Sequence, residues 1–336
     1  MIIDELSATI DAIATAGKGI LAADESTNTI AKRLSSIGVE STEQNRQRYR
    51  ELLFTTEGLD EFVNGVILFE ETLGQSTQSG QPFTELLSNK GIVPGIKVDK
   101  GLVPLAGTDG EKVTEGLDGL AQRLEGYKAQ GARFAKWRNV YNISEVQPSL
   151  TAVKAGAENL ARYASICQSL GIVPIVEPEV LMDGSHDIEQ CADVTEIVMH
   201  ELFNSLFEHQ VILESIILKP SMILAGKNSA EENSAEQIAE YTLSIFRNTV
   251  PAAVPTINFL SGGQTPQQAS QNLNAMNNFD SQPWNLSFSY GRALQEPCLK
   301  AWAGKDSNIA DAQAALLKRA RLNSAASMGE YNLDME

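Results

Sequence analysis

The chain has 336 residues, of which 43% are hydrophobic and 21% charged, a composition typical of a globular protein. Its net charge of −17 disfavours nucleic acid and acidic membranes as partners, although a few converging cations could still bind a small anion. No apolar run approaches the roughly 18 residues of a membrane span, and the first residues lack the pattern of a secretion signal, so we expect a cytoplasmic protein.

Cysteine and histidine are scarce and lack the spacing of a metal or redox site. The cysteines are Cys167, Cys191 and Cys298, and the histidines are His186, His200 and His209. Each cysteine stands in a segment with helical patterning, which indicates buried thiols. No two histidines are spaced as a helical ligand pair, so we expect no catalytic zinc or iron.

Eight short apolar segments recur along the chain, separated by stretches with helical patterning. The expected strands are residues 18–24, 65–69, 93–98, 132–138, 171–177, 211–219, 254–260 and 284–290. Helical patterning is clear at residues 111–130, 148–170, 187–209 and 235–248. Alternating strands and helices in this number predict a closed (β/α)8 barrel, the TIM-barrel type of α/β fold. We expect a single domain over residues 1–336, with residues 329–336 as a short C-terminal tail.

The sixth expected strand ends in a charged residue. Residues 211–218 form a largely apolar, β-branched run, and Lys219 and Pro220 follow it. A buried ammonium is costly unless it is paired or its pKa falls, and a lysine with a lowered pKa is the nucleophile that forms imines with carbonyl substrates. A lysine that merely extends from the end of the strand to water is the commoner alternative.

The other strands favour the first interpretation, because charged residues gather at the same end of five of them. These residues are Asp24 after the first strand, Lys97 and Asp99 on the third, Lys136 and Arg138 on the fourth, Glu177 and Glu179 on the fifth, and Lys219 on the sixth. Chemistry in such barrels lies at the carboxyl ends of the strands. Buried ion pairs that only fix the register are the structural alternative, but they seldom stabilise more than apolar packing does.

Two further loops are suited to bind phosphate. The seventh strand runs into Ser261-Gly262-Gly263, and the eighth into Ser289-Tyr290-Gly291-Arg292. Loops after these two strands often bind phosphate through backbone N–H groups, with an arginine as a bidentate partner. A weaker pattern, which could equally be a solvated helix face, suggests a second phosphate site. Its members are Ser26, Thr29, Arg33 and Lys97.

Seven motifs, in chain order, resemble class I fructose-bisphosphate aldolase. They are GILAADES at residues 19–26, GIKVDKG at 95–101, FAKWR at 134–138, VEPE at 176–179, LKP at 218–220, FLSGGQ at 259–264 and SYGRAL at 289–294. The resemblance extends from about residue 17 to about residue 330. It implies a lyase of glycolysis, gluconeogenesis or the Calvin cycle that works without metal or cofactor. Such an enzyme splits fructose 1,6-bisphosphate reversibly into glycerone phosphate and glyceraldehyde 3-phosphate, and is usually a homotetramer.

The resemblance also implies residue roles. Lys219 would form the imine, and Glu177 would be the general acid and base for carbinolamine formation and dehydration. Glu179 and Lys136 would tune Glu177, and Asp24 would bind the C4 hydroxyl and assist cleavage of the C3–C4 bond. The residues implied to bind phosphate or substrate are Ser261, Gly262, Gly263, Ser289, Arg292, Arg33 and Arg138, with Lys97, Ser26 and Thr29 near a second phosphate.

Other interpretations remain open from sequence alone. Sedoheptulose 1,7-bisphosphate would use the same lysine and both phosphate sites. A catalytically silent barrel that serves as a scaffold would be expected to lose the charged residues, which are present here. A metal-dependent aldolase is disfavoured by the lack of histidine ligands. Many eukaryotic aldolases end in a tyrosine that assists proton exchange on the enamine, and Tyr331 lies too early to be that residue.

Overall fold

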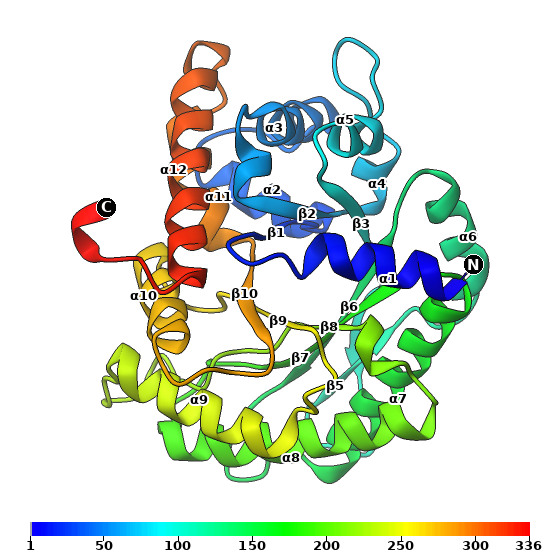
Figure 1. Cartoon of the computed structure of the whole chain (residues 1–336), viewed down its shortest axis with the longest axis vertical. Coiled ribbons are helices and arrows are strands. Elements are labelled where there is room, and N and C mark those ends of the chain that lie inside the picture. The colour runs from blue at the N-terminus through cyan, green and yellow to red at the C-terminus, as the bar shows by residue number, and fades with distance from the viewer. Residues whose placement is uncertain (1) are drawn as a thin grey trace.

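The computed structural model describes residues 2–336, and within them eight parallel strands close into a barrel (Figure 1). Around the barrel the strand order is β1-β10-β9-β8-β7-β6-β3-β2. The barrel strands are β1 (Gly19–Ala23), β2 (Val63–Leu68), β3 (Val93–Lys97), β6 (Phe134–Tyr141), β7 (Val173–Val180), β8 (Ile217–Leu218), β9 (Thr256–Phe259) and β10 (Asn285–Tyr290). The predicted (β/α)8 barrel is therefore confirmed.

Helices surround the barrel on its outer side, except α1, which lies across one end (Figure 1). They are α1 (Ile2–Ile13), α2 (Thr27–Ser35), α3 (Glu43–Thr55), α4 (Glu70–Leu73), α5 (Phe83–Asn89), α6 (Leu120–Ala129), α7 (Leu150–Ser169), α8 (Ile188–Glu208), α9 (Ala235–Thr249), α10 (Pro266–Asn277), α11 (Arg292–Trp302) and α12 (Ile309–Ser327). Short 3₁₀ turns are η1 (Leu59–Glu61), η2 (Leu213–Ser215), η3 (Asp306–Asn308) and η4 (Leu333–Met335). The three cysteines are buried in α7, α8 and α11, as predicted.

Helix α1, which was not among the predicted helices, closes the amino-terminal end of the barrel. Its buried side chains Leu6, Ile10 and Ile13 belong to one apolar cluster with barrel residues such as Phe134 and Ile217. The larger apolar layer lies between the outer face of the barrel and the surrounding helices. The interior is therefore filled with side chains, and the carboxyl ends of the strands are left for polar residues.

The prediction of a continuous strand over 211–219 is wrong in its first half. Residues 213–215 form η2, and only Ile217 and Leu218 pair in the sheet. The side chain of Gln168 on α7 accepts a hydrogen bond from Ile212 N and donates to Ile212 O and Ser215 O. Because a helix side chain satisfies these backbone groups, the segment does not need a strand partner.

The predicted helix over 111–130 begins too early. Residues 112–115 are β5 (Lys112–Glu115), which pairs antiparallel with β4 (Gly101–Pro104), and α6 starts only at Leu120. Gly116 and Gly119 have φ of +125° and +65°, which end the strand and prevent a helix from running through them. Helices α7, α8 and α9 follow the predicted ranges closely.

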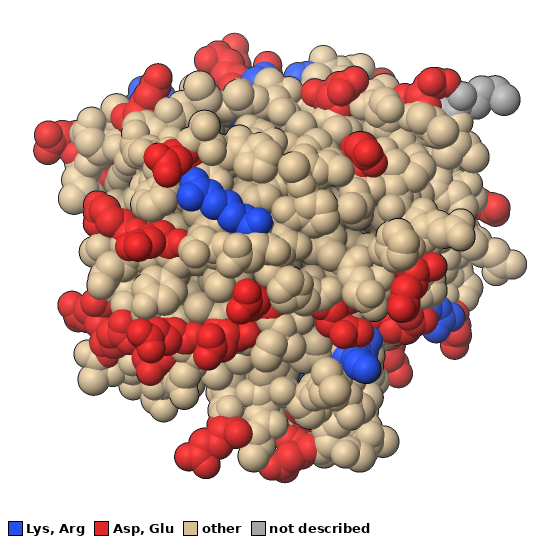
Figure 2. All heavy atoms as spheres, turned by 60° about the horizontal axis from the view of Figure 1, so that its bottom comes forward, with Lys and Arg blue, Asp and Glu red and all other residues tan. Residues whose placement is uncertain are grey.

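Acidic side chains predominate on the molecular face that carries α8 and α9, as expected from the net charge (Figure 2). Lysine and arginine are sparse on this face. Within residues 2–336, no helix is both long and apolar enough to cross a membrane.

Gly95 on β3 offers a stability test, because a Cβ there would lie 2.2 Å from the Phe134 ring inside the barrel. We expect Gly95→Ala to lower the free energy of unfolding by about 1–3 kcal/mol through overpacking. Gly126 on α6 is the control, since a Cβ there meets nothing within 4 Å and alanine favours helix. Thermal and denaturant unfolding of both variants should separate them, and equal stability would contradict the packing argument.

Candidate active site

One open cavity of about 480 Å³ at the carboxyl end of the barrel collects the predicted site residues. Those that line it are Asp24, Ser26, Thr29, Arg33, Lys97, Lys136, Arg138, Glu177, Glu179, Lys219, Ser261, Gly262, Gly263, Ser289 and Arg292. They come from the ends of β1, β3, β6, β7, β8, β9 and β10 and from the segments that follow. The structure therefore brings together all the residues that were predicted from the sequence to belong to the site.

A chain of ion pairs crosses the floor of this cavity. Lys136 Nζ lies 3.0 Å from Asp24 Oδ2 and 3.0 Å from Glu177 Oε2. The other oxygen of Glu177, Oε1, lies 3.2 Å from Lys219 Nζ. All four side chains are buried, with residue exposures between 3% and 9%. Lys219 is thus a buried, paired lysine and does not extend to water.

Burial and charge oppose each other in setting the protonation of these groups. Burial by itself raises the pKa of Asp24, but Lys136 and Lys219 outweigh it and hold that pKa well below its usual range. For Glu177, burial likewise raises the pKa, but Lys136 and Lys219 outweigh it and the pKa is lowered. Burial lowers the pKa of Lys136, but Asp24 and Glu177 raise it to well above its usual value. Lys136 therefore stays cationic between two carboxylates.

Glu179 has a different partner from Glu177. It contacts Arg138 Nε, and its Oε1 lies 3.2 Å from the place that a Cβ on Gly262 would occupy. Burial lowers the pKa of Arg138, but Glu179 more than offsets this, so the guanidinium is always charged. Glu179 thus lies beneath the loop after β9.

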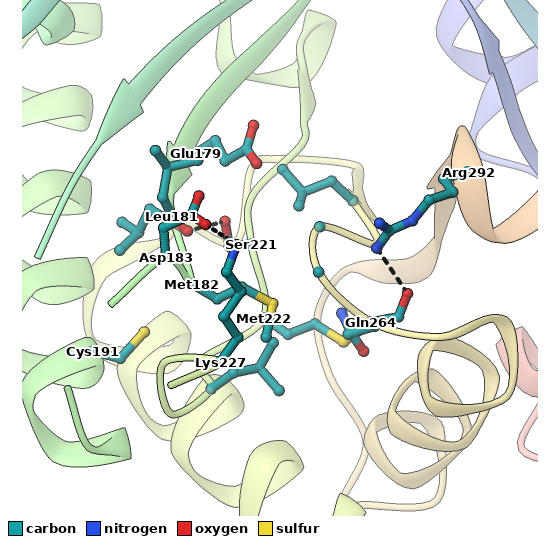
Figure 3. A pocket seen from close by; sticks show the side chains of 15 residues that line it. Glu179, Leu181, Met182, Asp183, Cys191, Ser221, Met222, Lys227, Gln264 and Arg292 are labelled. Atoms are coloured by element: carbon teal, nitrogen blue, oxygen red, sulfur yellow. Dashed lines mark hydrogen bonds and ion pairs between the residues drawn. The ribbon is translucent and has the colours of Figure 1, made fainter. Parts of the chain in front are cut away.

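That loop, residues 261–264, puts Gly263 in a left-handed backbone conformation that favours glycine. Gly263 has φ of +75°, and a Cβ there would lie 1.7 Å from Met182 Sδ. Arg292 Nη2 donates a hydrogen bond of 3.2 Å to Gln264 O (Figure 3). Ser289 lines the main cavity, and its buried Oγ has no hydrogen-bond partner among the described residues.

A second cavity of about 230 Å³ lies behind the same loop (Figure 3). It shares Glu179, Leu260, Gly262, Gly263 and Arg292 with the main cavity. The rest of its lining is mixed, with apolar Met182 and Met222 beside charged Asp183 and Lys227.

The end of β3 and the segment after β1 carry the second set of predicted phosphate ligands, although Arg33 also lies close to Gly291 in the loop after β10. Ser26 Oγ lies 3.1 Å from Thr29 Oγ1, and Lys97 Nζ lies 2.8 Å from Asp99 Oδ1. Arg33 on α2 pairs with Glu25. These hydroxyl and cationic groups lie together in the cavity wall.

Glu25 also forms hydrogen bonds with two residues that were not predicted to belong to the site. Its Oε2 accepts from Arg50 Nη2 at 2.6 Å, and its Oε1 accepts from Gln295 Nε2 at 2.9 Å. Arg50 is 2% exposed on α3, and Gln295 is 1% exposed on α11. Glu25 directly follows Asp24, but no pattern in the sequence marks Arg50 or Gln295.

Comparison with known proteins identifies the family. Residues 5–336 match the family model described as fructose-bisphosphate aldolase class-I. The chain belongs to the class I fructose-bisphosphate aldolases. Its activity is that of this family, a carbon–carbon lyase of glycolysis.

Relatives are similar over almost the whole chain. "Fructose-bisphosphate aldolase 5, cytosolic" of Arabidopsis thaliana is 57% identical over 98% of this chain and 92% of the relative. "Probable fructose-bisphosphate aldolase class 1" of Xanthomonas axonopodis pv. citri is 54% identical over 98% of this chain and 99% of the relative. The solved fructose-bisphosphate aldolase of Plasmodium falciparum, in complex with TRAP and a small-molecule inhibitor, superposes with a TM-score of 0.97 at 50% identity. That alignment covers 98% of this chain and 96% of the other.

The position of Lys136 in this aldolase predicts an effect on pH dependence. Lys136→Met removes a cation that lowers the pKa of both Asp24 and Glu177, so both pKa values should rise. We expect kcat/KM to fall by about a hundredfold or more, and the acidic limb of its pH profile to move to higher pH. Lys300→Met, at an exposed lysine paired with Glu296, is the control. An acidic limb that stays in place would contradict the charge balance described above.

Proposed function

We propose that this aldolase cleaves fructose 1,6-bisphosphate reversibly into glycerone phosphate and glyceraldehyde 3-phosphate through an imine on Lys219. The observation that carries the proposal is the buried contact of 3.2 Å between Lys219 Nζ and Glu177 Oε1. It puts a primary amine beside a proton carrier at the base of an open cavity, as imine formation requires.

The first chemical step joins the enzyme to the ketone. Lys219, once deprotonated, attacks C2 of the sugar and forms a carbinolamine. Glu177 takes one proton from the Lys219 ammonium, 3.2 Å away, before the attack and a second from the carbinolamine nitrogen. It delivers both to the C2 oxygen, which leaves as water, and an iminium remains. Lys136, with Lys219 and Arg138, lowers the pKa of Glu177 and keeps its carboxylate charged between turnovers.

The second step breaks the C3–C4 bond. The iminium accepts the electron pair of that bond and becomes an enamine, while the C4 hydroxyl gives its proton to the Asp24 carboxylate and becomes the aldehyde carbonyl. Asp24, with Lys136 3.0 Å away, binds this hydroxyl and orients it for cleavage. Protonation of the enamine at C3 and hydrolysis of the iminium then release glycerone phosphate and restore Lys219.

Phosphate groups at both ends of the sugar position the scissile bond. We assign the phosphate on the ketone side to the loop with Ser261, Gly262 and Gly263, together with Ser289 and Arg292. This loop adjoins Lys219, since Leu260 N donates to Pro220 O at 3.1 Å. The Arg33 guanidinium lies near the same loops, 3.7 Å from the place of a Cβ on Gly291. Ser26, Thr29 and Lys97 would hold the distal phosphate.

Substrate range and location are further parts of the proposal. Sedoheptulose 1,7-bisphosphate carries the same ketone and terminal phosphates, so we propose it as an additional substrate. The ratio of kcat/KM for the two sugars ranks them. A cytoplasmic location is supported by plant relatives that are named cytosolic or cytoplasmic.

Borohydride trapping tests the imine. Wild-type protein incubated with glycerone phosphate and EDTA, then reduced and digested, should carry one adduct on Lys219 by mass spectrometry. Lys219→Arg should lose both the adduct and turnover, whereas Lys227→Arg is the matched control at an exposed lysine. Folded protein with no adduct on any lysine would overturn the imine and favour a silent scaffold.

We also propose that the chain forms a homo-oligomer, a tetramer by family resemblance. Large apolar side chains are exposed on α8, where Phe207 is 81% and Ile197 54% exposed. Light scattering should give a mass that is a multiple of the 36.4 kDa chain. Phe207→Glu should lower that mass if this helix lies in an interface. A wild-type mass equal to one chain would contradict assembly.

A further inference from the structure

The segment after α12, residues 330–336, is connected to the start of α10 through one buried arginine. Arg319 on α12 is 3% exposed. Its Nη1 lies 2.5 Å and 2.7 Å from the two carboxylate oxygens of Glu336. Its Nη2 donates to Pro266 O at 2.8 Å and to Ser270 Oγ at 2.7 Å. One guanidinium therefore bridges the segment and the first turn of α10.

Further contacts fix Glu336 in this position. Tyr331, which is 5% exposed, donates through its hydroxyl to Glu336 Oε1 at 2.9 Å. The backbone N–H of Tyr331 donates to Asn274 Oδ1 on α10 at 2.9 Å. Lys318 Nζ contacts the main-chain oxygen of Glu336. The carboxylate is thus held by both Arg319 and Tyr331, and the segment is linked to α10 directly through Tyr331 N and indirectly through Arg319.

The first turn of α10 directly follows the loop that we assign to phosphate. Gln264, the last residue of that loop, is two positions before Pro266. Its side-chain oxygen accepts from Asn272 Nδ2 on α10 at 2.8 Å, and its main-chain oxygen accepts from Arg292 (Figure 3). A displacement of α10 would therefore also displace the loop and Arg292.

We propose that Arg319 and Glu336 are positioning residues for the phosphate on the ketone side. Their ion pair holds the start of α10, and hence the N–H groups of residues 261–263, in the geometry that phosphate needs. This inference rests on the phosphate assignment in the proposed function. Without the Glu336 carboxylate, Arg319 is a buried charge that lacks its counter-ion, and such a charge forces its surroundings to rearrange.

The expected effect is on phosphate affinity and not on the chemical step. Lys219 and Glu177 belong to the ends of β8 and β7, which the ion pair does not contact. A structural role alone would lower the melting temperature without a selective change in KM. A rise in KM with kcat unchanged therefore distinguishes a positioning role from a purely structural one.

The test compares Glu336→Gln with Glu330→Gln, which makes the same charge change in the same segment at an exposed residue. For Glu336→Gln we expect KM for fructose 1,6-bisphosphate to rise about tenfold, the size of a lost charged hydrogen bond, with kcat within about twofold. The inhibition constant of inorganic phosphate should rise by a similar factor. Tyr331→Phe, which removes one donor to Glu336, should raise KM by about twofold.

Hydrogen exchange supplies a readout that does not depend on turnover. Amides in a peptide covering residues 259–270 should exchange faster in Glu336→Gln than in Glu330→Gln or wild type. Unchanged exchange, or faster exchange with unchanged KM, would overturn the proposal. If inorganic phosphate does not inhibit the wild type, the phosphate assignment fails and the inference with it. Loss of positioning alone leaves the Lys219 adduct intact, whereas failure of the proposed function abolishes that adduct.

Discussion

The site depends on keeping charged groups buried in equal and opposite pairs. A lone lysine or carboxylate at this depth would become neutral or draw in water. Here Lys136 lies between Asp24 and Glu177, and Glu177 also faces Lys219. Each charged group offsets the desolvation cost of its neighbour. Removal of any one of these four side chains would therefore change the protonation of the others. A rigid barrel is suited to this arrangement because each strand end fixes one side chain at the cavity floor.

The residues farther from the floor show the same principle. Glu25 gathers Arg33, Arg50 and Gln295, which come from three different helices. Arg33 thereby faces the cavity with its charge already oriented. Glu179 and Arg138 form a comparable pair beneath the loop after β9. Cationic groups for a sugar bisphosphate are thus held by carboxylates before any substrate arrives, which limits the reorganisation that binding requires.

The barrel and the cavity residues could be predicted because their signals are local. Apolar segments alternate with helical patterns, and the polar residues stand at the last positions of the strands. The start of the sixth strand could not be predicted, because its geometry depends on Gln168, more than forty residues earlier in the chain. Arg50, Gln295 and Arg319 look like ordinary helix residues in the sequence. Their roles arise only from contacts between distant elements, which no local pattern reports.

Helix α1 has a consequence for the course of the reaction. Leu6, Ile10 and Ile13 fill the amino-terminal end of the barrel together with the side chains of the strands, so residues 2–336 leave the cavity no rear exit. Substrate, both products and the water that hydrolyses the iminium must share one opening. In the mechanism that we propose, the aldehyde fragment is not bonded to Lys219, whereas the other fragment is held covalently until water reaches it. A single entrance combined with a covalent tether therefore imposes an order on product release, with the aldehyde first.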